Sequence, residues 1–473
     1  MFKFEFSLSD DEGDAEEVLG PQASEFTQTA AKSQPTEVKA EVQFTEHPIS
    51  DLLSALPSLI SYSPITIPLR GNGSSSNGNP ATTTEEPKLT LVRRDLFDAR
   101  FQLISEGAGE AYMADDAEEI LDEEHAKKQE EAAKQAEEQK ERTTQSHISA
   151  LEFLEAPSDL VPGIYEGGLK TWECSLDLVD YLSSLKTPGA VNVYQGKRVL
   201  ELGCGTAIPS LYVLHEILSA PPSPDAPPTY VHLQDYNASV LDLVTLPNVL
   251  LTWYISPASL EYRTKNPPEV EVPAQAPSTS DTIEEEDEDG DDEAEEEEQP
   301  KSMGPGSTPI PDLTAPSDLT LPQSLKLAFI SSLEARNIHI RFFSGSWSSF
   351  DLSQTGGTYD LVLTSETIYR PDSLPSLVGL MDAACRRETG QRANPAGLDT
   401  LVQEKLSVDD TPEADSYLCL VAAKVLYFGV GGGVSDFVNA VENARKDEPH
   451  GKVSTVWERK MGVGRKVMRV QWD

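Results

Sequence analysis

The chain has 473 residues, 34 of them proline, and a formal net charge of −43. It is too long for one compact domain, yet so acidic a chain is not expected to fold over its whole length. The four cysteines lie far apart and form no C-x-x-C pair, which argues against a zinc site and against a disulfide framework. No uncharged apolar run is long enough to cross a membrane, and the first residues lack the basic start of a secretory signal. We therefore expect a soluble protein of the cytoplasm and nucleus without a bound metal.

Residues 1–158 are predicted to form an N-terminal region that is mostly disordered, with short ordered segments. Residues 1–10 alternate phenylalanine and leucine with polar residues, the period of a half-buried strand, so we expect this segment to dock as an edge strand. Residues 11–46 are acidic and polar, and prolines break up the apolar groups of residues 47–70. An amphipathic, ordered segment is predicted at residues 91–104.

The remaining chain, residues 159–473, is predicted to be one folded domain organised around the segment QGKRVLELGCGTAIP. The apolar run 199–202 predicts a buried parallel strand. Gly203 and Gly205 then permit a tight turn that presses the backbone against a ligand, and a helix begins near Ile208. A strand, a glycine turn and a helix N-terminus in this order are typical of the nucleotide-binding corner of a doubly wound α/β sheet.

Two acids and one departure from a known fingerprint indicate which nucleotide this corner binds. Ile208 stands at the sixth position of G-x-G-x-x-G, which spoils the pyrophosphate turn of a dinucleotide site. Glu201 precedes the first glycine, and Asp235 ends a second predicted strand, residues 230–234, where an acid can accept hydrogen bonds from ribose hydroxyls. Asn237 follows as the expected N-cap of the next helix. This combination fits S-adenosylmethionine better than a nicotinamide dinucleotide.

Residues 256–320 interrupt this domain, since they are rich in Pro, Ser and Thr and contain the acidic run EEEDEDGDDEAEEEE. Such a run cannot bury a core and repels itself, so we predict a disordered insertion. We favour a solvated spacer, and the alternative is an electrostatic lure for basic ribosomal or chromatin proteins. Beyond it, IRFFSGSW, TYDLVLTSETIY and YLCLVAAKVLYF predict further strands, and the last segments predict a closing hairpin. The order predicts a Rossmann-like, mainly parallel, doubly wound α/β sheet of about seven strands.

Polar residues follow several of these predicted strands, at the edge where a doubly wound sheet binds its ligand. Besides the glycine corner and Asp235, they are the turn at residues 345–347 and the segment SETIY at residues 365–369. Each has a structural interpretation when taken alone, but their shared position at strand ends favours a functional one. The face of Trp172 or of Trp347 is expected to cover an adenine or a positively charged sulfonium.

Several of these segments resemble the histidine protein methyltransferases, within the seven-strand methyltransferase-like superfamily. The resemblance is carried by GIYEGGLKTWECSLDLV, VLELGCGTAIP, VHLQDYN, FFSGSW, YDLVLTSETIY and VLYFGVGGG, with weaker likeness in MFKFEFSLSD and RRDLFDARFQL. It implies transfer of a methyl group from S-adenosylmethionine to one histidine of a basic large-subunit ribosomal protein. It also implies no direct contact with nucleic acid. We expect a monomer, because no heptad and no exposed apolar stripe is visible in the sequence.

The resemblance further assigns roles to residues of this chain. It implies that the cofactor is held by Trp172, Glu201, Gly203, Gly205, Asp235, Trp347 and Ser365. Asn237 is also expected to bind the cofactor, from its place beside Asp235 at the strand end. Glu366 and Tyr369 stand where the superfamily keeps an acceptor-side D-x-x-Y motif, and here Glu replaces the Asp. Glu366 is expected to orient an imidazole by accepting its N–H and to stabilise the imidazolium that develops. Ala207 replaces the third glycine usual in the superfamily.

Three other functions remain open on the sequence alone. An enzyme of the same fold could methylate lysine instead of histidine. The chain could also be a non-catalytic assembly factor whose acidic segments shield a basic ribosomal protein. A nicotinamide-dependent oxidoreductase is the third, and Ile208 argues against it.

Overall fold

The structure is a computed structural model. It describes residues 42–69, 87–113, 167–186, 193–223, 225–267, 311–386, 417–427, 431–443 and 450–472, with the backbone alone for residues 106–113. The predicted edge strand at residues 1–10 and the acidic run of the insertion lie outside these residues.

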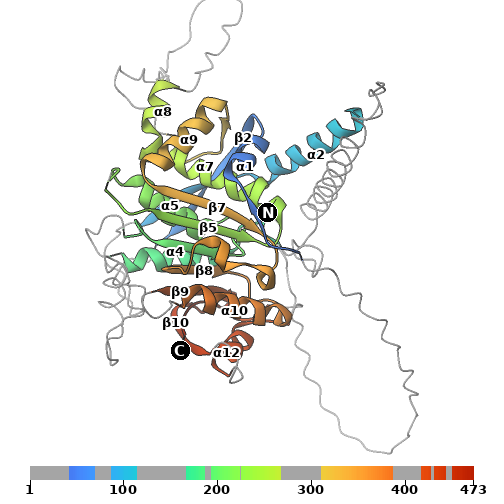
Figure 1. Ribbon diagram of the computed structural model, residues 1–473, viewed down its shortest axis with the longest axis vertical. Helices are drawn as coiled ribbons and strands as arrows, with labels where there is room; N and C mark the ends of the chain where they lie inside the picture. Colours follow the sequence, from blue (N-terminus) through green and yellow to red (C-terminus); the bar gives the residue numbers. More distant parts are fainter. Residues whose placement is uncertain are drawn as a thin grey trace, which may run out of the picture. The chain divides into compact units, whose positions relative to one another are not determined.

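Among the described residues, eight strands form the main sheet, in the order β1-β7-β5-β4-β8-β9-β11-β10 (Figure 1). They are β1 (Thr45–His47), β4 (Arg198–Leu202), β5 (Thr229–Asp235), β7 (Ile338–Ser344), β8 (Leu361–Ser365), β9 (Leu418–Lys424), β10 (Gly451–Arg459) and β11 (Arg465–Trp472). The central strands β7, β5, β4, β8 and β9 are parallel, whereas β1 and the closing hairpin add antiparallel pairs at the two edges. The predicted count of seven strands is therefore wrong by one, because β1 is too short to show an alternating pattern.

A second sheet, which the sequence did not predict, has the strand order β3-β2-β6. Its strands are β2 (Leu59–Pro68), β3 (Lys88–Arg94) and β6 (Ser317–Thr320). The prolines that break up residues 47–70 are tolerated here, because β6 pairs only with residues 59–62 of β2. Pro64 lies beyond that paired stretch, on a part of β2 that forms an edge, where a missing N–H costs no ladder hydrogen bond.

Helices cover both faces of the main sheet (Figure 1). They are α1 (Ile49–Ala55), α2 (Leu96–Met113), α4 (Glu173–Leu185), α5 (Ile208–Ser219), α6 (Ala238–Val240), α7 (Leu246–Ile255), α8 (Leu260–Lys265), α9 (Gln323–Ala335), α10 (Leu374–Cys385) and α12 (Val434–Glu442). Short helical turns are η1 (Leu241–Thr245, of the π type), η2 (Pro257–Ser259), η3 (Trp347–Ser349), η4 (Leu352–Thr355) and η5 (Pro371–Ser373). In β4, Val199 packs with α4, α5, α7 and α9 on one face, while Leu200 and Leu202 pack with α10 and α12 on the other.

The helical stretch Ala238–Ile255 is the most apolar of the described part of the chain. By length and composition alone it could cross a membrane, but 78% of it is buried inside the protein. Leu246, Leu250 and Trp253 belong to the main core cluster, with 0 to 1% of each residue exposed. Burial between the sheet and its neighbouring helices accounts for this composition.

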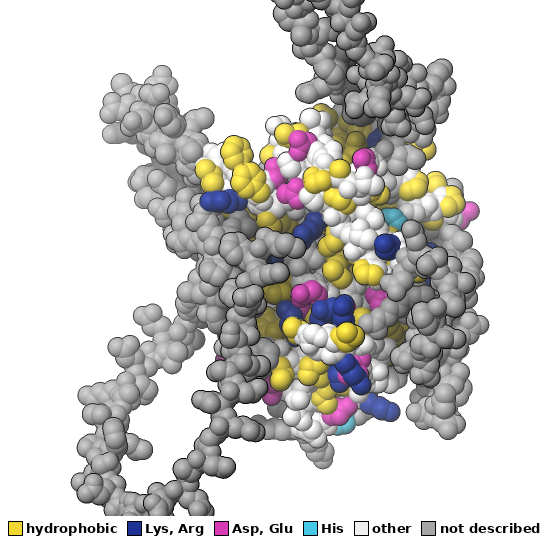
Figure 2. Space-filling view, turned by 180° about the vertical axis from the view of Figure 1, so that it is seen from behind, with side chains coloured by type: hydrophobic (Ala, Val, Ile, Leu, Met, Phe, Trp, Pro, Cys, Tyr) yellow, Lys and Arg dark blue, Asp and Glu magenta, His cyan; other side chains and the backbone are white. Residues whose placement is uncertain are grey.

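Helix α2 has one buried face and one exposed apolar face. Ala99 and Leu103 are buried in a small cluster with Leu169 and Val240. On the other face, Phe97, Phe101 and Ile104 are 74%, 65% and 44% exposed, and Figure 2 shows hydrophobic side chains gathered on this helix at the upper left. The amphipathic segment is therefore a helix, and it carries an exposed apolar stripe that the sequence analysis did not identify.

The boundaries predicted for the N-terminal region and the insertion need correction. Helix α8 and strand β6 both fall inside the range 256–320, so the insertion is narrower than predicted at both ends, and residues 268–310 lie outside the described part. Leu52, Ile60 and Leu91 join the same core cluster as α4 and α5. The core of the domain thus includes segments that precede residue 159.

Candidate active site

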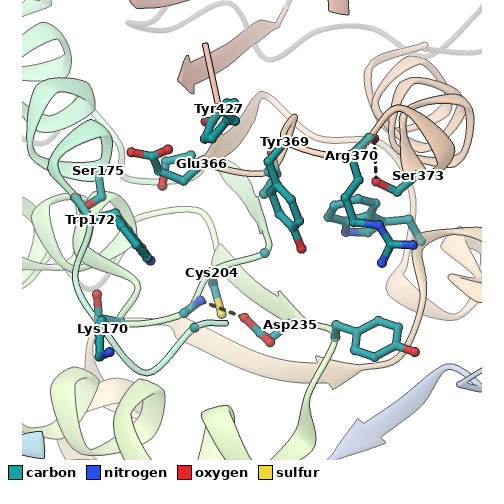
Figure 3. A pocket seen from close by; sticks show the side chains of 18 of the residues that line it. Lys170, Trp172, Ser175, Cys204, Asp235, Glu366, Tyr369, Arg370, Ser373 and Tyr427 are labelled. Carbon is teal, nitrogen blue, oxygen red and sulfur yellow. Dashed lines mark hydrogen bonds between the residues drawn. The ribbon is translucent and has the colours of Figure 1, made fainter. Parts of the chain in front are cut away.

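A pocket lies at the carboxyl ends of β4, β5, β7 and β8, next to the point where the strand order reverses between β4 and β8 (Figure 3). Doubly wound sheets bind their ligands at this switch point. The pocket is lined by Gly168, Lys170, Trp172, Ser175, Gly203, Cys204, Gly205, Thr206, Asp235, Tyr236, Ser346, Trp347, Ser348, Ser365, Glu366, Thr367, Tyr369, Arg370, Ser373, Ser376, Lys424 and Tyr427. The structure thus brings all the predicted site residues into the lining except Glu201 and Asn237.

The glycine corner is tightly packed, and its backbone conformation disfavours a side chain at either glycine. Gly203 and Gly205 have φ angles of 62° and 51°, which L side chains rarely adopt. A Cβ on Gly203 would lie 2.6 Å from Thr367 Cγ2, and a Cβ on Gly205 would lie 3.0 Å from the carbonyl oxygen of Gly168. The two glycines therefore let the loop before α4 and the loop after β8 meet at the end of β4.

Asp235 fixes the corner from the end of β5. Its Oδ2 accepts a hydrogen bond from the Gly205 N–H (2.9 Å), and its Oδ1 accepts one from the Asn237 N–H (3.0 Å). Burial raises the pKa of Asp235 to about 6, although these hydrogen bonds act in the opposite direction. At neutral pH the carboxylate is mostly ionised, and it lines the pocket as an acceptor of the kind that ribose hydroxyls require.

Gln234, which the sequence analysis treated only as part of a strand, connects three segments of the pocket. Its Oε1 accepts hydrogen bonds from the Gly203 N–H (3.2 Å) and from Trp347 Nε1 (3.0 Å). Its Nε2 donates to the Gly345 carbonyl (2.8 Å). The side chain is fully buried, so it fixes the Trp347 ring relative to the glycine corner. The sequence signal that could have identified Gln234 is a glutamine inside an otherwise apolar predicted strand.

The chain before β1 supports the same turn from the other side. The carbonyl of Val42 accepts hydrogen bonds from the Ser346 N–H and the Ser349 hydroxyl, both at 3.0 Å. A Cβ on Gly345 would lie 2.5 Å from the Gln43 carbonyl oxygen. Residues 42–47 therefore hold the turn that carries Trp347.

Glu201 and Asn237, which were predicted to hold the cofactor, are not part of the pocket lining and support the site from outside it. Glu201 lies on the same face of β4 as Val199, beneath α5, where its Oε2 accepts the Ser210 N–H (2.9 Å). Burial raises its pKa to about 8, so it is mostly protonated at neutral pH. Asn237 stands at the predicted N-cap position, but its side chain donates to the Gly167 carbonyl (3.1 Å) instead of capping the helix.

Glu366 is held in a strained conformation just after β8. Its φ angle is 58°, which costs a residue other than glycine on the order of 1–3 kcal/mol. Its N–H donates to the Ala422 carbonyl (2.9 Å). The side chain is 8% exposed, and the Lys424 ammonium group lies 3.4 Å from Oε1. Neither carboxylate oxygen accepts a well-aligned hydrogen bond from the residues that the structure describes. Buried carboxylates require donors, so this position favours a ligand that presents an N–H or O–H.

Tyr369 lies across the pocket from Trp172 (Figure 3), and a glycine packs behind its backbone. A Cβ on Gly432 would collide with the carbonyl groups of Tyr369 and Ile368. Gly432 therefore serves close packing inside the protein. The Tyr369 ring stands edge-on to Tyr427, with 6.3 Å between centroids.

Several residues of the lining were not predicted from the sequence, among them Lys170, Arg370, Lys424 and Tyr427. Lys170 and Tyr427 lie inside two of the motifs that carry the resemblance, but those motifs assigned them no role. Lys424 ends β9, and the rule that ligands bind at the carboxyl ends of parallel strands could have identified it.

A mainly parallel sheet covered by helices on both faces, with a pocket at its switch point, defines a Rossmann-like α/β protein with a candidate ligand site at the carboxyl ends of its strands. No family model matches the chain. The chain is similar to Histidine protein methyltransferase 1 of Saccharomyces cerevisiae, with 31% identity over 356 residues that cover 73% of this chain and 67% of that protein. The protein of the same name from Schizosaccharomyces pombe is 29% identical over 330 residues, covering 68% and 69%. The Bos taurus homolog is 30% identical over 294 residues, covering 60% and 51%.

The chain therefore belongs to the histidine protein methyltransferase family, a family of enzymes. This confirms the resemblance drawn from the motifs in the sequence.

Proposed function

We propose that this protein transfers a methyl group from S-adenosylmethionine to a ring nitrogen of a histidine in a protein substrate. The observation that carries the proposal is the buried Glu366 carboxylate, which lines the same pocket as the glycine corner. Apart from the Lys424 ammonium group 3.4 Å from Oε1, it has no well-aligned hydrogen-bond donor among the described residues. Membership of the family supports histidine as the acceptor.

The lining suits S-adenosylmethionine by its chemistry. Asp235 offers a carboxylate for ribose hydroxyls, and Gly203 and Gly205 let the backbone approach the ligand closely. The aromatic rings of Trp172 and Trp347 offer faces for a flat base or a cation. When bound, this cofactor supplies an electrophilic methyl group on a positively charged sulfur.

The chain's own residues have a modest chemical task. A neutral imidazole is already a nucleophile at neutral pH, because its ordinary pKa is about 6.5. Glu366 accepts the N–H of one ring nitrogen, which directs the lone pair of the other nitrogen into the pocket. The same carboxylate stabilises the positive charge that the ring gains. Positioning of this kind can lower a barrier by roughly 7–11 kcal/mol.

For the substrate we propose a basic large-subunit ribosomal protein, methylated by a monomer in the cytoplasm and nucleus without direct contact with nucleic acid. The motif resemblance supports the choice of substrate. The strongly acidic chain, with its formal net charge of −43, is suited to attract a basic partner.

Incubation with tritiated S-adenosylmethionine and ribosomal proteins from cells that lack this protein tests the proposal. We expect radioactivity in methylhistidine after acid hydrolysis. Glu366→Gln keeps the shape of the side chain but weakens its acceptor and removes its charge, so we expect turnover to fall about 100-fold or more with S-adenosylhomocysteine binding intact. Radioactivity in methyllysine would show that the acceptor is lysine instead of histidine. Failure to bind S-adenosylhomocysteine would refute the proposal that this protein uses S-adenosylmethionine.

A further inference from the structure

Lys424 contacts two carboxylates and an aromatic ring in the pocket. Its Nζ lies 3.4 Å from Glu366 Oε1 and 3.6 Å from Glu173 Oε2. The same ammonium group lies 4.3 Å from the centroid of the Trp172 ring, in the geometry of a cation–π contact. The Lys424 side chain is 18% exposed. Contacts with two carboxylates and one aromatic ring thus restrict the position of the ammonium group.

Two neutral groups complete the surroundings of Glu366. Burial, and then the negative charge of Glu366, raises the pKa of the Cys174 thiol and of the Tyr427 phenol above their usual values. The Tyr427 oxygen accepts the backbone N–H of Lys424 (3.3 Å), and Figure 3 shows the Tyr427 ring beside Glu366. Among the described residues, Lys424 is the cation that contacts the Glu366 carboxylate.

The two oxygens of Glu366 are therefore not equivalent. Oε1 faces the ammonium group of Lys424, whereas Oε2 has no cationic partner and no well-aligned hydrogen bond among the described residues, with the neutral Cys174 thiol and Tyr427 phenol near the carboxylate. A free glutamate side chain has several rotamers, and fixing one of them costs up to about 2 kcal/mol of conformational entropy. A charge contact on one oxygen offsets that cost before the substrate arrives and leaves the other oxygen available.

We infer that Lys424 is a positioning residue, which holds Glu366 through Oε1 so that Oε2 receives the N–H of the acceptor imidazole. This inference rests on the proposed function, and it adds a residue that acts through Glu366. Trp172 and Glu173 contribute indirectly, because both contact the Lys424 ammonium group and so help to hold it beside the Glu366 carboxylate. One face of the Trp172 ring therefore contacts a lysine of the chain itself.

The experiment uses the full chain and compares Lys424→Met with Lys424→Arg, and with Lys466→Met as a matched control. Lys466 lies on the neighbouring strand β11, with its Nζ 3.6 Å from Glu458 Oε1 and away from the pocket lining. Methyl transfer to ribosomal proteins gives kcat and KM, and calorimetry gives the Kd for S-adenosylhomocysteine. Thermal unfolding is recorded for every variant.

We expect Lys424→Met to lower kcat about 10- to 100-fold, the effect of a misplaced catalytic group. Its Kd for S-adenosylhomocysteine should stay within about twofold of the parent. Lys424→Arg should recover most of kcat, because arginine keeps the charge. Lys466→Met should match the parent protein. Adding Lys424→Met to Glu366→Gln should cause little further loss, since both changes act through one group.

Three outcomes would overturn the inference. They are full kcat in Lys424→Met while Glu366→Gln is impaired, additive losses in the double variant, and loss of S-adenosylhomocysteine binding in a folded Lys424→Met. If Lys424→Met does not fold, the kcat of Lys424→Arg decides instead. The double variant is then made with Lys424→Gln in place of Lys424→Met and compared with Glu366→Gln alone. Full activity in Glu366→Gln would refute the proposed role of Glu366 itself, a result distinct from any failure of Lys424.

Discussion

Lowering the pH should weaken cofactor binding through Asp235. This carboxylate lines the pocket, and burial raises its pKa to about 6. If a bound ligand requires the ionised form, the apparent Kd rises by the factor 1 + 10^(pKa − pH). The Kd should therefore about double at pH 6 and rise about 11-fold at pH 5, relative to pH 7.5.

Calorimetric titration with S-adenosylhomocysteine between pH 5 and 7.5 measures this change. None of the described lining residues is a histidine, the side chain that ordinarily titrates in this window. Asp235→Asn is the control, and we expect it to bind weakly and with little dependence on pH. A Kd that stays constant down to pH 5 in the parent protein would refute the reasoning, as would equal pH dependence in Asp235→Asn.

Protonation of Asp235 should favour the folded protein, whereas it should weaken cofactor binding. Because its pKa is raised on folding, the folded protein binds more protons than the unfolded chain between about pH 4 and 6. The contribution of Asp235 to stability is thus fully present below pH 4 and is lost as the pH rises through 6, by about 3 kcal/mol. Binding that weakens at low pH therefore cannot be explained by unfolding driven by Asp235.

Three substitutions test the packing around the pocket. Gly432→Ala places a methyl group against the backbone of Tyr369, so we expect methyl transfer to fall more than tenfold. Gly379→Ala, a helical site with open space, is its control and should leave transfer unchanged. Gln234→Leu removes three buried hydrogen bonds and should lower the free energy of unfolding by about 1–3 kcal/mol and raise the Kd for S-adenosylhomocysteine. Ala207→Gly relieves a φ angle of 58° and should add up to about 1 kcal/mol in chemical denaturation, since relief of about 1–2 kcal/mol is partly offset by unfolded-state entropy. A destabilised Ala207→Gly or a fully active Gly432→Ala would contradict these arguments.

The sequence predicted the centre of the fold well because burial on both faces leaves a clear pattern there. The apolar runs of β4 and β8 and the glycines after β4 gave correct elements in the correct order. The second sheet was missed because Pro64 interrupts β2, and because β6 has four residues and joins β2 from more than two hundred residues away. Such a pairing depends on tertiary contacts that no local window contains.

The residues of the candidate site also differ in how far local sequence patterns could predict their roles. Glu201 was assigned to the cofactor because of its place beside the glycines, but side chains alternate along a strand and this one faces α5. Gln234 and Lys424 were missed because their importance depends on what lies opposite them, Trp347 and Gly345 in one case and Glu366 in the other.

The support that residues 42–47 give to the Trp347 turn determines how this protein can be shortened in the laboratory. A version cut at residue 159 would look reasonable by its motifs, but it would lose the strand that braces one wall of the pocket and part of the hydrophobic core. Production of an active catalytic fragment should therefore start before Val42.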